Sequence, residues 1–120
     1  MIFSQTKIAD FKWEKRLLIV SGASELIVTQ LKAEKAGLEE RDLQVFVLSG
    51  WGEKEFPVNP KLADEFESRL SPPEAVPMVY LIGKDGITAK SWMMKEFTFQ
   101  KLFASIDSMP MRQREMRDGK

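Results

Sequence analysis

A hairpin that opens with a proline constrains the fold more than any other part of the chain. Pro77 precedes residues 78–82, a short apolar run that is rich in Val, Ile and Tyr. Such a run predicts a strand buried on both faces rather than a helix. Because proline cannot donate to a sheet ladder, Pro77 is expected at the first strand position or on an edge. Asp85-Gly86 then predicts a two-residue hairpin turn, with residues 87–92 as the partner strand.

Two further apolar runs predict strands. One covers residues 16–20, and the other covers residues 42–48 after a polar connection at residues 38–41. The nearly continuous apolar character of the second run favours a parallel strand that is covered on both faces. In the loop that follows, Trp51 and Phe56 either line a groove or fold inward, and the sequence does not choose between the two.

Three segments have the apolar periodicity and the end signals of amphipathic helices. Ser24 is the expected N-cap of the first helix, and Gly37 is its expected left-handed end. Residues 60–70 carry apolar side chains at i, i+4 and i+8, which predicts the second helix. The third helix follows Thr98 and ends at Pro110, because proline cannot continue a helix.

The order of the predicted elements indicates the fold class. A βαβ unit is followed by a ββα unit, and the first crossover is expected to be right-handed. We therefore predict an α/β fold with a central mixed four-stranded sheet flanked by about three helices. Residues 1–120 are expected to form a single domain, with residues 1–15 as a mixed lead-in and residues 111–120 as a mixed-charge tail.

Two missing residue types exclude several chemistries. The chain has no Cys, so it offers no disulfide, thiolate nucleophile or dithiol couple. It has no His either, which removes the commonest general base and the usual zinc ligands. We therefore expect a binding domain rather than an enzyme, with no metal and no bound cofactor.

Charge and hydropathy limit the partners. The formal net charge is zero, whereas a nucleic-acid surface needs a basic excess to release counterions from phosphate. The apolar runs are too short to span a bilayer, and residues 1–4 show no signal-peptide pattern. We expect a protein or peptide partner, no nucleic acid and no membrane span. Two properties stay open: the oligomeric state, and whether the protein is cytoplasmic or exported with a signal peptide absent from this chain.

The element order, with a proline opening the third strand, is similar to the thioredoxin fold. In that family a cis proline preceded by a hydrophobic residue faces the N-terminus of the first helix. Val76-Pro77 and the turn Ser21-Gly22-Ala23-Ser24 occupy those two places here. The resemblance implies a cis Val76–Pro77 bond and a binding face whose residues are Ser21, Gly22, Ser24, Val76 and Pro77. Redox members carry Cys-x-x-Cys at the turn, so Ser-x-x-Ser implies a redox-inactive domain.

Four motifs spread over most of the chain carry a closer resemblance. They are Phe11-x-Trp13-x-x-Arg16-Leu17-Leu18, Glu40-Arg41-Asp42-Leu43, Leu81-Ile82-Gly83-Lys84-Asp85-Gly86, and Ile106-Asp107-Ser108-Met109-Pro110-Met111-Arg112-x-x-Glu115-Met116. Together they resemble a bacterial thioredoxin-like family classified as domain of unknown function 4174. That family is related to the DUDES group, whose vertebrate members are secreted extracellular-matrix proteins. The resemblance implies a fold but no activity. It leaves the role of ten motif residues unassigned: Arg41, Asp42, Lys84, Asp85, Asp107, Met109, Pro110, Met111, Arg112 and Glu115.

The proposed binding face has a functional and a structural interpretation. Ser21 and Ser24 either offer a helix N-terminus to an anion or peptide carbonyl, or simply form a turn and a cap. Val76-Pro77 either presents backbone groups to an extended peptide or is an ordinary strand start.

The motif residues also allow two interpretations. Residues 84–86 form either only a hairpin turn or a surface ligand for a partner, and Arg41-Asp42 is a candidate local ion pair. Asp107 with Arg112 and Arg114 is expected to tie the tail onto the last helix. The alternative is an adaptable apolar binding surface formed by Met109, Met111 and Met116.

Three functional hypotheses follow. The main one is a redox-inactive thioredoxin-like domain that binds an extended peptide or protein segment. The second is a cofactor- or thiol-dependent enzyme of thioredoxin-like ancestry, in which Ser21 or Ser24 would hold a thiolate. The third is a structural or matrix-type interaction domain that acts through its surface or through self-association.

Overall fold

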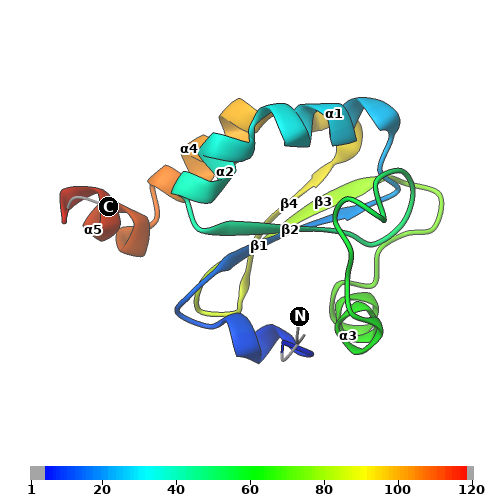
Figure 1. Cartoon of the computed structure of the whole chain (residues 1–120), viewed down its shortest axis with the longest axis horizontal. Coiled ribbons are helices and arrows are strands. Elements are labelled where there is room, and N and C mark those ends of the chain that lie inside the picture. Colours follow the sequence, from blue (N-terminus) through cyan, green and yellow to red (C-terminus); the bar gives the residue numbers. More distant parts are fainter. Residues whose placement is uncertain (1–4, 119–120) are drawn as a thin grey trace.

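A mixed sheet of four strands forms the centre of the computed structural model, which describes residues 5–118 (Figure 1). The strands are β1 (Arg16–Ser21), β2 (Leu43–Val47), β3 (Met78–Ile82) and β4 (Thr88–Met93). Their order across the sheet is β2-β1-β3-β4. β1 is parallel to β2 and antiparallel to β3, and β3 is antiparallel to β4. The predicted mixed four-stranded sheet is therefore confirmed.

Helices cover both faces of this sheet. The helices are η1 (Ile8–Phe11, 3-10), α1 (Glu25–Ala33), α2 (Lys35–Glu40), α3 (Pro60–Leu70), η2 (Met94–Glu96, 3-10), α4 (Phe99–Asp107) and α5 (Pro110–Arg117). One face carries α1, α2 and α4, and the other carries α3 and η1 (Figure 1). α5 extends beyond α4 at one end of the molecule. No helix among residues 5–118 is long and apolar enough to cross a membrane.

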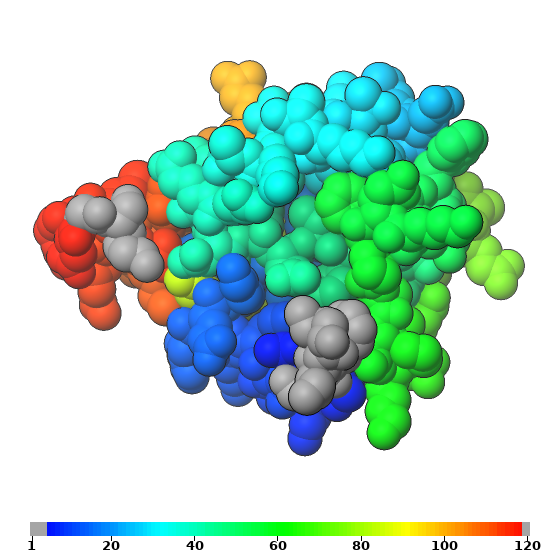
Figure 2. Space-filling model, viewed as in Figure 1, coloured from blue at the N-terminus to red at the C-terminus, as the bar shows by residue number. Residues whose placement is uncertain are grey.

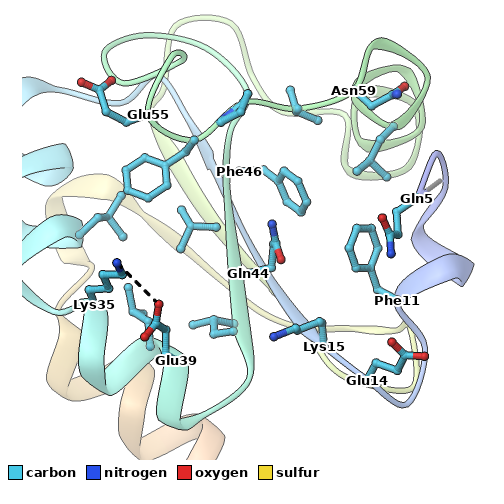
Figure 3. Close-up of a pocket in the computed structure, with 18 of the residues that line it drawn as sticks. Gln5, Phe11, Glu14, Lys15, Lys35, Glu39, Gln44, Phe46, Glu55 and Asn59 are labelled. Carbon is cyan, nitrogen blue, oxygen red and sulfur yellow. Dashed lines mark ion pairs between the residues drawn. The ribbon is translucent and has the colours of Figure 1, made fainter. Parts of the chain in front are cut away.

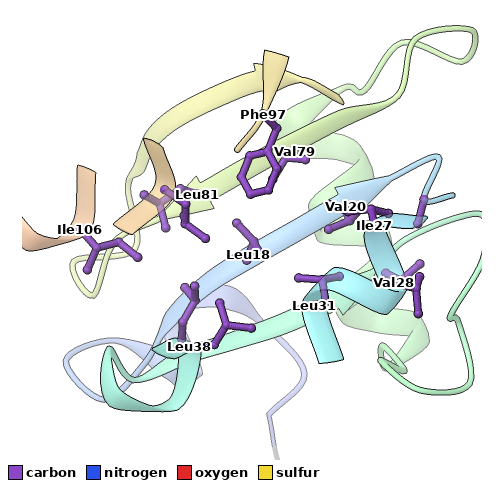
Figure 4. Close-up of a cluster of buried hydrophobic side chains, with 14 residues drawn as sticks. Leu18, Val20, Ile27, Val28, Leu31, Leu38, Val79, Leu81, Phe97 and Ile106 are labelled. Carbon is purple, nitrogen blue, oxygen red and sulfur yellow. The ribbon is translucent and has the colours of Figure 1, made fainter. Parts of the chain in front are cut away.

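The central strand β1 divides the core into two clusters. Side chains of a strand alternate between its faces. Leu18 and Val20 therefore pack with α1, α2 and α4 (Figure 4), whereas Leu17 and Ile19 pack with η1 and α3. All four residues are at most 1% exposed. Because a strand covered on both faces needs apolar residues at every core position, its sequence pattern was easy to recognise.

Local signals placed several helix boundaries correctly. The α3 helix covers the predicted residues 60–70. The side chain of Ser24 accepts a hydrogen bond from the backbone N–H of Ile27, and that of Thr98 accepts one from Lys101. Both caps depend on residues within one turn, which is why the sequence alone identified them.

The prediction that the first helix ends at Gly37 is wrong. The chain bends at Glu34, and Gly37 lies inside α2, so residues 38–41 are largely helical rather than a polar connection. A Cβ atom on Gly37 would lie 3.0 Å from the Phe103 ring of α4. Gly37 therefore allows close packing of α2 on α4, and the left-handed residue is Asp42 instead, with φ +51°.

The β3–β4 connection is longer than the predicted two-residue turn. Gly86 does have a positive φ, +81°, but the loop begins at Gly83 and the next strand begins only at Thr88. The N–H of Gly83 donates to the carbonyl of Ile87, and the N–H of Gly86 donates to that of Gly83. The loop is therefore a turn closed by two backbone bonds around Lys84.

Two predictions about the ends of elements also need correction. Pro110 does not only stop α4, because it is the first residue of α5, where its missing N–H has no intrahelical partner to lose. The predicted tail at residues 111–120 is thus mostly helical within its described part. The described chain has five α-helices rather than about three, the additional ones being α2 and α5.

The strand predicted at residues 42–48, which is β2, is parallel as expected, but it lies at the edge of the sheet. β2 pairs with β1 on one side only. Gln44 is exposed and Val45 is half-buried, so the prediction of full cover on both faces is wrong for this strand.

Candidate functional site

The turn after β1 is held in place by Ser49. The N–H groups of Gly22 and Ala23 both donate to the Ser49 carbonyl, at 3.1 and 2.9 Å. The Ser49 hydroxyl accepts a further bond from the Gly22 N–H at 2.9 Å. Gly22 adopts φ +76°, a conformation that side chains with a Cβ disfavour. Three hydrogen bonds to Ser49 therefore hold the backbone of this turn.

Pro77 lies directly against this turn. A Cβ on Gly22 would be 3.3 Å from the Cα and the Cβ of Pro77. Ser21 is paired with Met78 in the ladder between β1 and β3, and the Pro77 carbonyl accepts a hydrogen bond from the N–H of Met94 at 2.9 Å. The turn at residues 21–24 and the segment at residues 76–77, which are far apart in the sequence, therefore lie side by side.

The Val76–Pro77 bond is trans, since the described residues contain no cis peptide bond. The cis bond that the thioredoxin resemblance implied is therefore wrong. The trans form is the intrinsically preferred one for X–Pro bonds, by about 0.5–1 kcal/mol. Here the Pro77 carbonyl accepts a hydrogen bond from Met94, the residue directly after β4.

We call the hollow at this junction the Pro77 cleft. It measures about 330 Å³. Its lining residues are Ser21, Gly22, Ser49, Glu67, Pro72, Pro73, Glu74, Ala75, Val76 and Pro77. Four of the five residues expected at the binding face thus lie together. Ser24 is the exception, because it does not line the cleft and its hydroxyl caps α1.

Val76 differs from its neighbours in this cleft. Its side chain is 38% exposed. Among residues 5–118, neither its N–H nor its carbonyl has a hydrogen-bond partner. The backbone of Val76 is therefore available to a ligand that can both donate and accept.

The cleft is acidic. Glu67 and Glu74 line it, and no Lys or Arg within residues 5–118 does. The charge of Glu67 also acts on Tyr80 of β3. Burial raises the pKa of the Tyr80 phenol, and the negative charge of Glu67 raises that pKa further. A ligand with a basic group suits this surface better than an anion.

Most of the unassigned motif residues meet elsewhere, in a group that we call the ionic cluster. Its members are Arg16, Glu40, Arg41, Asp42, Lys84, Asp107, Arg112 and Glu115. They come from β1, the end of α2, the α2–β2 connection, the β3–β4 loop, α4 and α5. Four cations and four carboxylates give the cluster no net formal charge.

One half of the ionic cluster is centred on Glu115. The Arg16 guanidinium donates to both Glu115 oxygens, at 3.3 and 3.2 Å, and the Lys84 ammonium donates at 2.6 Å. Lys84 also binds Asp42 at 2.9 Å. Arg16 is 1% exposed and Lys84 8%. Burial alone would raise the pKa of Glu115, but the hydrogen bonds from Lys84 and Arg16 outweigh burial and lower this pKa below its ordinary value.

The other half is centred on Asp107. Arg41 donates to its two oxygens at 3.1 and 3.0 Å, and Arg112 donates at 3.1 Å. Arg112, which is 1% exposed, also binds Glu40 at 2.8 Å. These bonds outweigh the effect of burial and lower the pKa of Asp107. Arg41 also lies over the Phe103 ring, 4.0 Å from its centroid.

The ionic cluster revises several expectations. Arg41 and Asp42 each have a partner from a distant segment, so a purely local pair is an incomplete description. Lys84 is buried and is not a surface ligand. The expected bond between Asp107 and Arg112 is confirmed, whereas Arg114 is exposed.

The remaining motif residues have local or packing roles. The Asp85 carboxylate accepts a bond from the N–H of Ile87 and closes the loop. Met109 packs against the core cluster between the sheet and α1, α2 and α4. Met111 is half-buried, and Met116 is 41% exposed. The three methionines thus do not form one exposed surface.

Sequence reasoning missed Arg16 and Glu40 as members of the ionic cluster. Arg16 directly precedes the apolar run at residues 17–20. A charged residue next to a buried strand was the available signal for a buried ion pair. Among residues 5–118, no group of three His, Cys, Asp or Glu side chains is arranged to hold a metal ion.

A larger hollow of about 1100 Å³, the β2 groove, runs over the edge strand (Figures 2 and 3). Phe46 and Gln44 lie at its centre, between α2 on one side and Phe11 on the other (Figure 3). Phe56 lines the groove and also packs, half-buried, against the core, so both alternatives describe it, whereas Trp51 is exposed outside the groove. Two ion pairs, Lys32–Glu55 and Lys35–Glu39, lie among its lining residues.

Comparison with known proteins supports the fold described above. The model of a family described as Domain of unknown function (DUF4174) matches residues 7–115. One similar solved structure is that of Plasmodium yoelii Prx1a, which was modified at the N-terminus and forms an artifactual octamer. Its TM-score is 0.64 at 11% identity, and the match covers 89% of this chain and 80% of the Prx1a chain. The mitochondrial 2-Cys peroxiredoxin from Plasmodium falciparum has a TM-score of 0.56 at 10% identity, covering 83% and 78%. The search of curated proteins found no match. At these identities the likeness shows the fold alone, and that fold is thioredoxin-like.

Proposed function

We propose a binding function for this chain, which belongs to the family described as Domain of unknown function (DUF4174). The Pro77 cleft takes up an extended peptide segment of a partner protein, and the domain performs no dithiol chemistry of its own. The carrying observation is Val76, a 38% exposed residue that lines the cleft and whose backbone has no hydrogen-bond partner within residues 5–118.

The backbone geometry supports an extended ligand. Val76 directly precedes Pro77, whose carbonyl accepts a hydrogen bond from Met94 just after β4, so an incoming strand could extend this pattern by pairing with Val76. Gly22 leaves room beside Pro77, because a side chain at that position would come within 3.3 Å of the proline ring. The cleft thus offers backbone pairing beside a proline.

Charge indicates the kind of peptide. Glu67 and Glu74 line the cleft without a basic residue among its lining side chains. A segment with a Lys or Arg side chain beside its extended backbone would gain favourable electrostatics there. Ser21 stands where redox relatives of this fold carry a cysteine, and a serine hydroxyl forms no disulfide with a bound peptide.

The test is a binding assay on an array of extended peptides with and without Lys or Arg. Glu67→Gln and Glu74→Gln should weaken binding of the basic peptides about 3–10-fold each, while the neutral peptides change little. Asp64→Asn is the matched control, since Asp64 is exposed on α3 and lies outside the cleft. If basic and neutral peptides bound equally well to the wild type and to both variants, the proposal would be contradicted.

Two further measurements address the competing hypotheses. Insulin reduction above background by the purified protein would contradict the redox-inactive part. Saturable binding of glutathione that Ser21→Ala abolishes would instead support a thiol-dependent enzyme. Reversible self-association in light scattering would support a structural domain of the matrix type.

A further inference from the structure

Glu115 occupies a site with the features of a carboxylate receptor. The Arg16 guanidinium contacts both oxygens of Glu115, and Lys84 binds one of them at 2.6 Å. Arg112 adds a third cation, with its Nη1 at 3.7 Å from the Glu115 carboxylate. Two-pronged contacts from a buried arginine, reinforced by an ammonium, are the arrangement by which proteins recognise planar anions.

The receptor belongs to the body of the domain, whereas its occupant belongs to α5. Arg16 opens β1 and Lys84 lies in the β3–β4 loop. The backbone of both cations therefore belongs to the sheet and its connecting loop, and not to the last helix. Glu115 reaches them from a helix that follows α4 and lies at one end of the molecule (Figure 1).

Charge, rather than apolar burial, holds α5 in place. The one buried side chain of this helix is Arg112, which binds Asp107 and Glu40. Met111 is only half-buried and Met116 is 41% exposed. Because ion pairs can be exchanged for other ion pairs while apolar contacts are simply lost, a helix held in this way is open to competition by an external anion.

We propose that Arg16 and Lys84 form a carboxylate-binding site that Glu115 fills within the chain, and that an external carboxylate takes the place of Glu115 and releases α5. The ligand is a carboxylate, either a free small anion or an acidic side chain of another protein. α5 then acts as an internal competitor whose release reports occupation of the site.

The cost of an empty site explains why release requires a ligand. If α5 left alone, Arg16 and Lys84 would both lose the Glu115 carboxylate, and Lys84 would keep only its bond to Asp42 among the contacts described above, so two cations would lose a close counter-charge. An incoming carboxylate removes that penalty. The Nε atom of Arg16, buried and without a partner among the described residues, is a donor that Glu115 leaves unused. Arg112 leaves with α5, so the site offers an external anion the contacts of Arg16 and Lys84 together with this unused donor.

Chemical rescue tests the receptor. Glu115→Ala in the full chain removes the occupant and leaves space beside both cations, so the thermal midpoint should fall by roughly 10 °C or more. Sodium acetate should then raise the midpoint of this variant with the logarithm of its concentration, beyond the effect of sodium chloride at equal ionic strength. Glu39→Ala is the control, because the Glu39 side chain is 67% exposed and binds only Lys35. Acetate acting no better than chloride on Glu115→Ala would overturn the proposal.

Hydrogen exchange on the wild type tests the release, and it also covers the case in which Glu115→Ala does not fold. Acetate and a blocked glutamate peptide represent the free and the protein-borne ligand. Faster exchange of the α5 amides with acetate alone would identify a small anion, and a stronger effect of the peptide would identify an acidic protein segment. Unchanged exchange with both, relative to chloride, would overturn the proposal.

Discussion

The Glu115 carboxylate lies 2.6 Å from the Lys84 ammonium, although 31 positions separate the two residues in the chain. This contact joins α5 to the β3–β4 loop, and Arg16 extends it to the first strand. A hairpin loop, a central strand and a terminal helix thus depend on one group of charges. The stability of these three segments should therefore change together.

Lys84→Met tests that dependence. The variant keeps an unbranched side chain but removes the cation shared by Glu115 and Asp42. Removing one cation from this largely buried network weakens the compensation of the Glu115 charge, which Arg16 alone then contacts closely, and should lower the free energy of unfolding by about 3 kcal/mol. Urea unfolding followed by circular dichroism measures the change. Lys90→Met, at an exposed position of β4, should stay within about 0.5 kcal/mol of wild type. Similar values for the two variants would contradict the structural role of Lys84.

Acid should destabilise the protein through Glu115 and Asp107. Their pKa values are lowered in the folded state from ordinary values of 4.5 and 3.8. A carboxylate with a depressed folded pKa stabilises the native state at pH values above its unfolded pKa, and this contribution disappears as pH falls toward the folded pKa. Unfolding free energy should thus decline below about pH 4.5. In Glu115→Gln the decline should be shallower, and an identical pH profile would refute the assignment.

Leu102→Ala should be among the costly single changes. Leu102 is 0% exposed in the cluster between the sheet and α4. Truncating it removes apolar burial and leaves a cavity, which typically costs about 2–5 kcal/mol. Leu26→Ala is a matched control in α1, since Leu26 is 67% exposed, and its effect should be within about 0.5 kcal/mol. Thermal unfolding of both variants distinguishes the two sites, and an equal loss would argue against the assigned packing.

Gly22→Ala should both destabilise the turn and disturb the Pro77 cleft. The positive φ costs a residue with a Cβ about 1–2 kcal/mol, and the new methyl group would press against Pro77. Gly37→Ala should cost less, because Gly37 has no positive φ and the facing Phe103 ring needs to move only slightly. Chemical denaturation of the two variants gives the comparison. A larger loss for Gly37→Ala would show that the φ of Gly22 is not the deciding factor.

The proposed peptide face was only partly accessible to sequence reasoning. Ser21, Gly22, Val76 and Pro77 were correctly expected to meet, because strand order places the end of β1 beside the start of β3. The isomer of the proline bond was not predictable in the same way. The free-energy difference between isomers is small, so the surrounding structure decides it, and here the bond is trans.

By itself, the sequence determined the elements whose signals are local. The apolar run of β1, the periodicity of α3 and the caps at Ser24 and Thr98 each depend on residues within a turn or a strand, so their pattern is complete in one dimension. Only the tertiary structure decided which charges meet. Arg16 and Glu115 are 99 positions apart, and any of the charged residues was an equally plausible partner until the fold brought these two together. The pairing of ions depends on distance and burial in space, and neither quantity is written in the order of the residues.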